Sequence, residues 1–286
     1  MDFRVQQEYK THPVMLFPAR KVNSLPKRET IRLPHTSCLL FLVILMAPAI
    51  SSSHLTAQTK AESTYYSRAN TYAVFFAYSP DSSHMLLGSA EHRMLLDIGA
   101  SYSRRLFLNH AVNWQYSGEL LPVALESDPL SRVVENQTTP AIATYTYDQG
   151  PVVDCAPASA PYVEYLENGA VFSAGTYTLT CYRRRWTIGE AMSPVGFQWN
   201  FLPGRKTQPF FVGHGGYMYS TQPIPMPDAG SFNFTCDLGA GLEFYRSKTK
   251  SIRAELRYHH ISNHGTALEN PGIDNLLYQV TYSFGH

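Results

Sequence analysis

Apolar and polar residues alternate with a period of two along much of the chain after residue 70. The longest such stretch runs from Phe232 to Phe244, where every even position is apolar and the odd positions between them are polar or glycine. Because successive side chains of a strand point to opposite faces, this pattern predicts strands with one apolar face. Eight segments share it, and we expect strands at 71–80, 92–105, 110–122, 186–202, 208–219, 231–246, 251–262 and 275–284.

The connections between these strands alternate between short and long. The short ones are 106–109, 203–207 and 246–250, and the long ones are 80–91, 123–185, 222–230 and 263–274. Outer-membrane barrels show this alternation, with short periplasmic turns and long outer loops. The sequence therefore predicts an all-β fold, an eight-stranded antiparallel transmembrane β-barrel with long extracellular loops.

The connection 123–185 is too long for a simple loop. Its segments Asn136–Pro140 and Ala156–Pro161 are turn-like, whereas 177–181 alternates as a strand does. We expect an outer loop with a small hairpin of its own. Arg183–Arg185 then marks the return to the barrel, either as a solvated rim or as a contact for lipid phosphates.

A soluble β-sandwich or a lipocalin-like barrel would show the same alternation, with its apolar face turned to a core. Three features favour the membrane. The chain is 13% aromatic and only 16% charged, its N-terminus resembles an export signal, and its last strand ends in alternating aromatics up to Phe284, as bacterial outer-membrane proteins do. The formal net charge of +1 offers no basic surface for nucleic acid.

The N-terminal region has the layout of a secretory signal peptide. Basic residues such as Lys27 and Arg28 precede the apolar run Cys38–Ala47, which is too short to span a bilayer, and small residues follow it. We expect cleavage after Ala57, with an N-terminal extension and signal peptide over 1–57 and the barrel over 58–286. Because the basic region is long, a translation start at Met15 or later stays open.

Three cysteines follow the expected cleavage point, namely Cys155, Cys181 and Cys236. Export makes a disulfide chemically accessible. Two interpretations stay open: a Cys155–Cys181 bond that leaves Cys236 free, or three unpaired thiols.

Polar residues interrupt the apolar face of the last predicted hairpin. The alternation places His260 and Ser262 on the lipid-facing side near the outer rim, with Cα atoms about 6–7 Å apart. The same register, extended back along the last strand, reaches Asp274. Serine ester hydrolysis needs such a hydroxyl, base and acid, and polar groups in a membrane are costly unless they are paired or functional. We expect the three to converge on the outside of the barrel.

Each of the three residues alone also fits a structural role, as an interfacial histidine, a turn-starting serine or a loop-capping aspartate. Among rival residues, His259 falls on the lumen face, and His264 and Glu269 fall in the loop. Histidines on alternate faces argue against a shared zinc ion, so we expect neither metal nor cofactor.

The hairpin motif resembles a known family. His260-Ile-Ser262-Asn263, followed by Asn270-Pro-Gly272 and an acidic residue two positions later, looks like the lipid A 3-O-deacylase family of outer-membrane barrels. The resemblance covers about 194–284, particularly to the acyloxyacyl-hydrolase-like branch. Further segments that carry it are Ser193–Phe201, Gly213–Gly216 and Phe232–Phe234.

This resemblance implies roles for the residues of the hairpin. Ser262 would be the nucleophile, His260 the general base and Asp274 the orienting acid. The well-studied members of the family carry Glu at the acid position, which is one methylene longer. The reach of Asp274 to His260 is therefore a question for the structure.

The resemblance also implies a substrate and supporting groups. The backbone N–H of Gly265 and the side chain of Asn270 would form the oxyanion hole, with Asn263 in support. The family acts on the ester-linked acyl chain at position 3 of lipid A, so lipid A or lipopolysaccharide is the expected substrate. The alternatives are a non-catalytic barrel that retains the motif and a small porin, which a side-chain-filled lumen argues against. The oligomeric state stays open, a homodimer included.

Overall fold

The computed structural model describes residues 65–286, which form a single extended sheet of antiparallel strands. No helix in this part of the chain is long and apolar enough to cross a membrane. The strands are β1 (Asn70–Ser79), β2 (Met94–Leu108), β3 (Val112–Thr139), β4 (Ala143–Pro151), β5 (Ala158–Tyr165), β6 (Val171–Phe201), β7 (Thr207–Ser220), β8 (Phe232–Tyr245), β9 (Lys250–Ser262) and β10 (Ile273–Gly285). A 3-10 turn, η2 (Pro227–Ala229), lies between β7 and β8.

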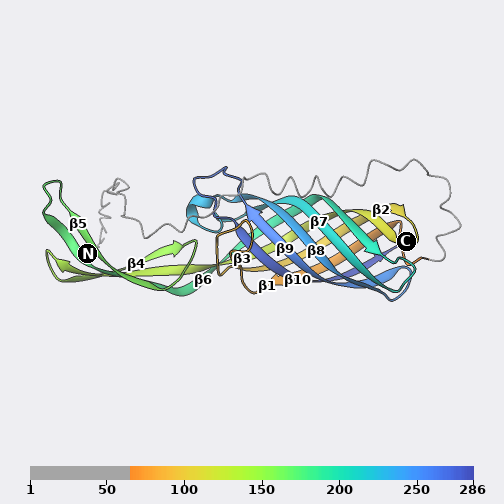
Figure 1. Ribbon diagram of the computed structural model, residues 1–286, viewed down its shortest axis with the longest axis horizontal. Helices are drawn as coiled ribbons and strands as arrows, with labels where there is room; N and C mark the ends of the chain where they lie inside the picture. Colours follow the sequence, from red (N-terminus) through yellow and green to blue (C-terminus); the bar gives the residue numbers. More distant parts are fainter. Residues whose placement is uncertain (1–64) are drawn as a thin grey trace, which may run out of the picture. The chain divides into compact units, whose positions relative to one another are not determined.

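Eight of these strands close into a barrel (Figure 1). β1 pairs with both β2 and β10, the pairing continues on either side to β3 and β6, and a β3–β6 ladder closes the ring. Every predicted strand overlaps one strand of this ring. The expected eight-stranded antiparallel barrel is confirmed.

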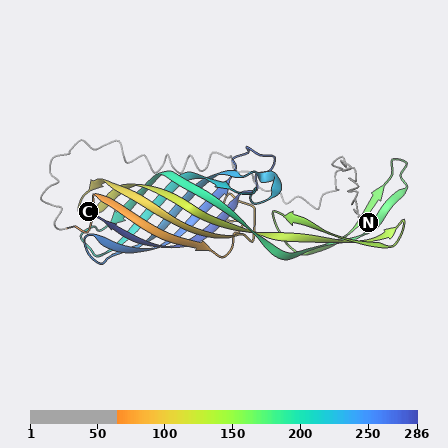
Figure 2. The ribbon, with the colours of Figure 1, turned by 180° about the vertical axis from the view of Figure 1, so that it is seen from behind.

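The connections gather at two ends of the barrel. The short β2–β3, β6–β7 and β8–β9 turns lie at the end that also holds both ends of the described chain. There Tyr66 N–H donates to the Pro203 carbonyl, and the His286 carbonyl accepts from Ala69 and Asn70. The long connections after β1, β7 and β9 lie at the other end (Figure 2). Such long loops are the outer ones in barrels of this type.

The predicted alternation decides which side chains line the outside of the barrel. Val74, Phe76 and Val280 are exposed to 55%, 48% and 57%, while the residues between them on the strands are buried. Near the short-turn end, Tyr72 lies against Tyr102 and Phe284, with ring centroids 5.4 and 6.1 Å away. An apolar belt flanked by aromatic residues matches the hydrocarbon layer and its interfaces.

Two prolines within the ring lie at irregular pairings, where a strand tolerates a missing N–H. On β3, Pro122 falls where Leu121 pairs with Ala191 but Ala124 pairs with Gly189. On β6, Pro194 falls in a similar shift against β7. At each bulge the outward-facing positions change from even to odd, as the change from Leu120 to Val123 on β3 shows.

β3 and β6 continue well beyond the barrel as one long ladder, from Leu125↔Ile188 to Thr139↔Ala174. β4 pairs along the free edge of β3 and β5 along that of β6 (Figure 1). Where the sequence led us to expect an outer loop with a small hairpin over 123–185, the chain forms a four-stranded sheet instead. The turn-like residues Asn136–Thr139 belong to β3, because cross-strand pairing overrides their local preference.

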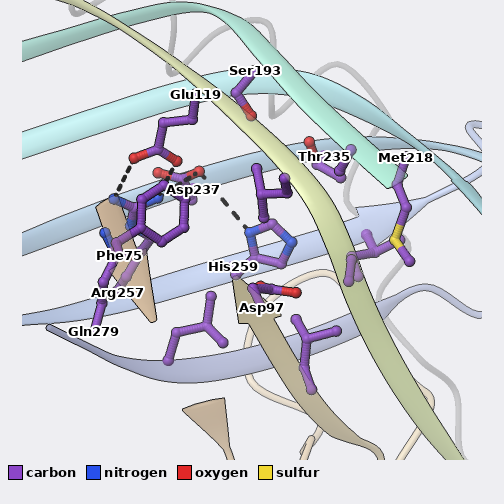
Figure 3. A pocket seen from close by; sticks show the side chains of 16 residues that line it. Phe75, Asp97, Glu119, Ser193, Met218, Thr235, Asp237, Arg257, His259 and Gln279 are labelled. Carbon is purple, nitrogen blue, oxygen red and sulfur yellow. Dashed lines mark hydrogen bonds and ion pairs between the residues drawn. The ribbon is translucent and has the colours of Figure 1, made fainter. Parts of the chain in front are cut away.

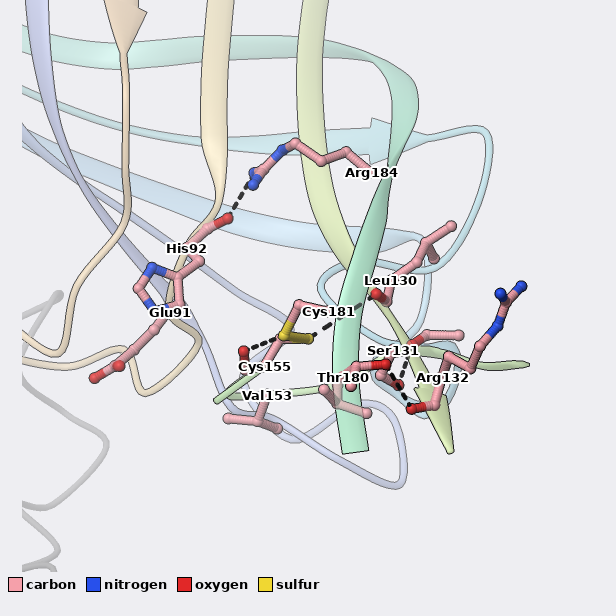
Figure 4. The surroundings of a disulfide bond; sticks show 12 residues. Glu91, His92, Leu130, Ser131, Arg132, Val153, Cys155, Thr180, Cys181 and Arg184 are labelled. Carbon is pink, nitrogen blue, oxygen red and sulfur yellow. Dashed lines mark hydrogen bonds between the residues drawn. A yellow bond between two sulfur atoms is a disulfide. The ribbon is translucent and has the colours of Figure 1, made fainter. Parts of the chain in front are cut away.

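A disulfide joins Cys155, between β4 and β5, to Cys181 on β6 (Figure 4). The predicted Cys155–Cys181 bond is confirmed. The prediction that Cys236 is a free thiol is wrong, because the described residues include no free cysteine. The expected signal peptide and its cleavage at Ala57 lie outside the described residues.

Candidate active site

His260 and Asp274 form a close pair on the outer face of the last hairpin. They are direct cross-strand partners in the β9–β10 ladder, and His260 Nδ1 lies 2.6 Å from Asp274 Oδ1. The carboxylate can only accept, so the proton of the imidazole sits on Nδ1 and Nε2 is left as the basic nitrogen. His260 is 7% exposed and Asp274 is fully buried. The shorter acid therefore reaches the histidine, because it lies directly opposite it.

Three further donors surround the Asp274 carboxylate. The Tyr258 hydroxyl donates to Oδ1 at 2.9 Å, and the backbone N–H groups of Leu86 and Leu87 donate to Oδ2, each at 2.8 Å. The two leucines belong to the long β1–β2 connection. This loop has no sequence pattern that points to the hairpin, so the sequence analysis missed it. Tyr258 was assigned there only to the lipid-facing stripe.

Ser262 is the last residue of β9 and is half-buried. It follows His260 by two positions, so the two side chains share a face of the strand. Within residues 65–286 its Oγ makes no hydrogen bond. The hydroxyl is therefore not engaged elsewhere, and it lies on the same face of β9 as His260.

Asn263 organises the loop that follows Ser262. Its amide donates to the carbonyls of Ala229 and Glu269, the latter at 2.6 Å, and its Oδ1 accepts from Gly265 N–H at 2.8 Å. The Asn263 N–H donates in turn to Asn270 Oδ1 at 3.1 Å. Asn263 is 1% exposed. Asn263 therefore holds the loop after Ser262 in place.

The two expected oxyanion donors, Gly265 and Asn270, differ in whether their N–H groups are already hydrogen-bonded. The Gly265 N–H donates to Asn263 Oδ1 in this structure, so its expected role in the oxyanion hole stays a prediction. Asn270 uses only its oxygen within the loop, and its Nδ2 makes no bond within the described part of the chain. An amide N–H₂ in this state can donate to a developing oxyanion.

The rival residues lie where the sequence analysis placed them. His259 points into the lumen, where its Nδ1 lies 4.0 Å from an oxygen of Asp237 (Figure 3). His264 and Glu269 lie in the β9–β10 loop, where the His264 ring packs edge-on against Phe234 of β8 with ring centroids 6.1 Å apart. The three histidines of this hairpin therefore do not gather around one point.

A second Ser–His–acid arrangement lies inside the barrel. His214 Nδ1 is 3.0 Å from Asp237 Oδ1, and its Nε2 is 3.1 Å from Ser117 Oγ. Ser117, His214 and Asp237 are exposed to only 2%, 2% and 3%. A Cβ at Gly196 would lie 2.1 Å from the His214 ring, so the imidazole is tightly packed. No acyl ester can enter this place, and the arrangement serves the polar packing of the lumen.

The lumen around it is filled and charge-paired. Arg257 Nη1 lies 2.8 Å from Glu119 Oε2 and 3.5 Å from Asp237 Oδ2 (Figure 3). Glu119, His214 and Asp237 have donor atoms close enough for a metal ion. Arg257 already supplies the positive charge between the two carboxylates. The neighbouring cavity has a volume of about 20 Å³, which is room for about one water molecule. A lumen filled in this way does not suit a pore.

Comparison with known proteins agrees with the motif on the hairpin. The family model described as Lipid A 3-O-deacylase (PagL) matches residues 157–283. No curated protein matches the sequence. Among solved structures, the outer membrane enzyme PagL is 18% identical, with 75% of this chain and 99% of that chain covered and a TM-score of 0.38.

Two other solved outer-membrane proteins show weaker likeness. Neisserial surface protein A is 10% identical, with 76% of this chain and 97% of that chain covered and a TM-score of 0.35. OprG from Pseudomonas aeruginosa is 8% identical, with 77% and 98% covered and a TM-score of 0.35. The strand pairing, not these likenesses, establishes the barrel. Residues 157–283 thus match the model of the lipid A 3-O-deacylase (PagL) family, and the apolar belt of the barrel agrees with a place in the bacterial outer membrane.

Proposed function

We propose that the protein is an outer-membrane hydrolase that removes the ester-linked acyl chain at position 3 of lipid A. The observation that carries this proposal is the His260–Asp274 pair, 2.6 Å apart on the lipid-facing side, with an unbonded serine hydroxyl two residues away. The family match over residues 157–283 supports the substrate.

In this proposal Ser262 Oγ attacks the carbonyl carbon of the ester. His260 Nε2 takes the hydroxyl proton, and Asp274 stabilises the imidazolium that forms. Asn270 Nδ2 donates to the oxyanion of the tetrahedral intermediate. His260 Nε2 then gives this proton to the departing alkoxide of the sugar. The acyl group stays on Ser262 as an acyl-serine. Water, deprotonated by His260, releases the fatty acid and restores Ser262.

The site lies where such an ester would be found. His260, Ser262 and Asp274 lie at the outer end of the barrel on its exterior, and lipid A has its ester bonds between the sugar headgroup and the acyl chains. Polar side chains on that surface are costly in a membrane unless they are paired or functional. A lipid substrate can reach the hydroxyl from the bilayer without entering the barrel.

The matched pair of serine variants tests this proposal. Ser262→Ala should abolish loss of the acyl chain from lipid A in membranes or detergent, as seen by mass spectrometry. Ser117→Ala removes the serine of the buried arrangement and should leave the activity unchanged. Full activity in Ser262→Ala would refute the mechanism. If the wild-type protein releases no acyl chain from several lipid A forms, the barrel is a non-catalytic protein that retains the motif.

A further inference from the structure

We propose that Tyr258 and the turn Leu86–Gly88 are positioning elements that fix the Asp274 carboxylate for catalysis. This inference deepens the proposed function and rests on it. Neither element touches the reacting atoms. Both act through the acid that orients His260.

The carboxylate of Asp274 is fully occupied by donors. Oδ1 accepts from His260 and from the Tyr258 hydroxyl, and Oδ2 accepts from the N–H groups of Leu86 and Leu87. Four hydrogen-bond donors stop a buried carboxylate from rotating and stabilise its ionised form before the substrate binds. The plane of the imidazole follows, because Oδ1 holds its Nδ1.

Tyr258 reaches the acid along the outer face of the hairpin. It precedes His260 by two residues on β9, and its own partner on β10 is Leu276, two residues after Asp274. The phenol therefore crosses diagonally to the carboxylate, which is a normal reach for a long aromatic side chain. Its hydroxyl would otherwise face the apolar belt, where an unpaired polar group is costly.

The β1–β2 connection is attached to the strand that carries the acid. Ser83 N–H donates to the Asp274 carbonyl, Ser89 N–H to the Pro271 carbonyl and Ala90 N–H to the Gly272 carbonyl. These bonds lie on both sides of the turn that binds Oδ2. The turn is thus held against the hairpin independently of the carboxylate.

Glycine at position 88 permits the close approach. A Cβ there would lie 2.7 Å from the Asp274 nitrogen, 2.8 Å from the Ile273 carbonyl carbon and 3.0 Å from Asp274 Oδ1. Such contacts are too short for any side chain, and a backbone this close requires glycine. The turn lies directly against the carboxyl group of Asp274. The length of Asp274 and the position of the turn are therefore matched.

Tyr258→Phe removes one donor and keeps the ring. We expect kcat to fall about 10-fold with KM unchanged, because a bond to a charged group is lost but no substrate contact is. Tyr278→Phe is the matched control, since Tyr278 lies on the same belt, is 57% exposed and donates no hydrogen bond in the described structure. Gly88→Ala should lower kcat at least as much, while Ser83→Ala, an exposed side chain in the same loop, should not.

A double-mutant cycle and a spectroscopic signal separate positioning from stability. In an Asp274→Asn background, Tyr258→Phe should have little further effect, because coupled residues are not additive. The low-field proton resonance of the His260 Nδ1–H should shift in Tyr258→Phe and not in Tyr278→Phe. Unchanged kcat and an unchanged resonance in Tyr258→Phe would overturn the inference. An inactive wild-type protein whose resonance still shifts would refute the proposed function and leave the positioning role standing.

Discussion

Asp274 lies directly across the β9–β10 ladder from His260, and its Oδ1 is 2.6 Å from the imidazole Nδ1. Strand register alone sets this relationship, because directly opposed residues have Cβ atoms only about 4.5–5.5 Å apart. An aspartate spans that gap. Although its side chain is one methylene shorter than that of glutamate, it reaches His260 without a shift of the histidine. What the short side chain does need is a neighbour for its second oxygen, and the Leu86–Gly88 turn supplies it.

Asp274→Glu should therefore reduce activity, although glutamate is the acid of well-studied members of the resembled family. The longer side chain would meet the turn at Gly88, where an added Cβ would lie 3.0 Å from Asp274 Oδ1. We expect kcat to fall about 10-fold or more, since small misplacements in a catalytic group are costly. Steady-state kinetics on a purified lipid A would measure it. Equal or higher activity in Asp274→Glu would show that the turn yields freely.

Asn270→Asp should separate the two uses of the Asn270 side chain. Aspartate keeps an oxygen for the Asn263 N–H, which Asn270 now accepts at 3.1 Å, but loses the Nδ2 donor. Loss of one oxyanion donor typically costs about 10²–10³ in kcat. Glu269→Gln, in the same loop, is the control and should retain activity. Comparable kcat in wild type and Asn270→Asp would remove Asn270 from the oxyanion hole.

The sequence predicted the barrel well because its signals are local. Alternation along β8 and β9 reports which face of each strand meets lipid, and it predicts that His260 and Ser262 share the face opposite the lumen. Cross-strand register then followed from the hairpin and reached Asp274. The prediction failed over 123–185, where paired strands continue beyond the barrel and the apolar alternation weakens.

Contacts between distant segments had no such signal. Leu86, in the Leu86–Gly88 turn, is 188 residues before Asp274 in the sequence. Its contribution is made by backbone N–H groups, which any residue carries. The bond from the Gly265 N–H to Asn263 Oδ1 had no signal in the sequence for the same reason.

The lipid-facing assignment of β1 predicts a strong effect of charge on one face only. Val74 lies mid-strand and is 55% exposed in the apolar belt. Val74→Arg should destabilise the barrel by about 2–4 kcal/mol, the cost of Arg near the bilayer midplane. Refolding into lipid vesicles at graded urea would measure it. Thr146→Arg, on the exposed strand β4, should have little effect, and equal losses in both variants would contradict the assignment of Val74 to the lipid.

Arg257 is the central cation of the filled lumen. Its removal should lower the stability of the barrel and leave the geometry of the candidate active site unchanged. Its guanidinium contacts Glu119, Asp237 and Glu255, with nearest distances of 2.8, 3.5 and 2.7 Å. Arg257→Met fills similar space but leaves these carboxylates unpaired, and breaking a buried pair costs about 3–5 kcal/mol. Urea unfolding in vesicles should show this loss, while the folded fraction keeps the kcat of wild type. A triple variant Arg257→Met, Glu119→Gln, Asp237→Asn should recover part of the stability, because the unpaired charges are gone. If Arg257→Met alone unfolds at the same urea concentration as wild type, the lumen cluster does not stabilise the barrel.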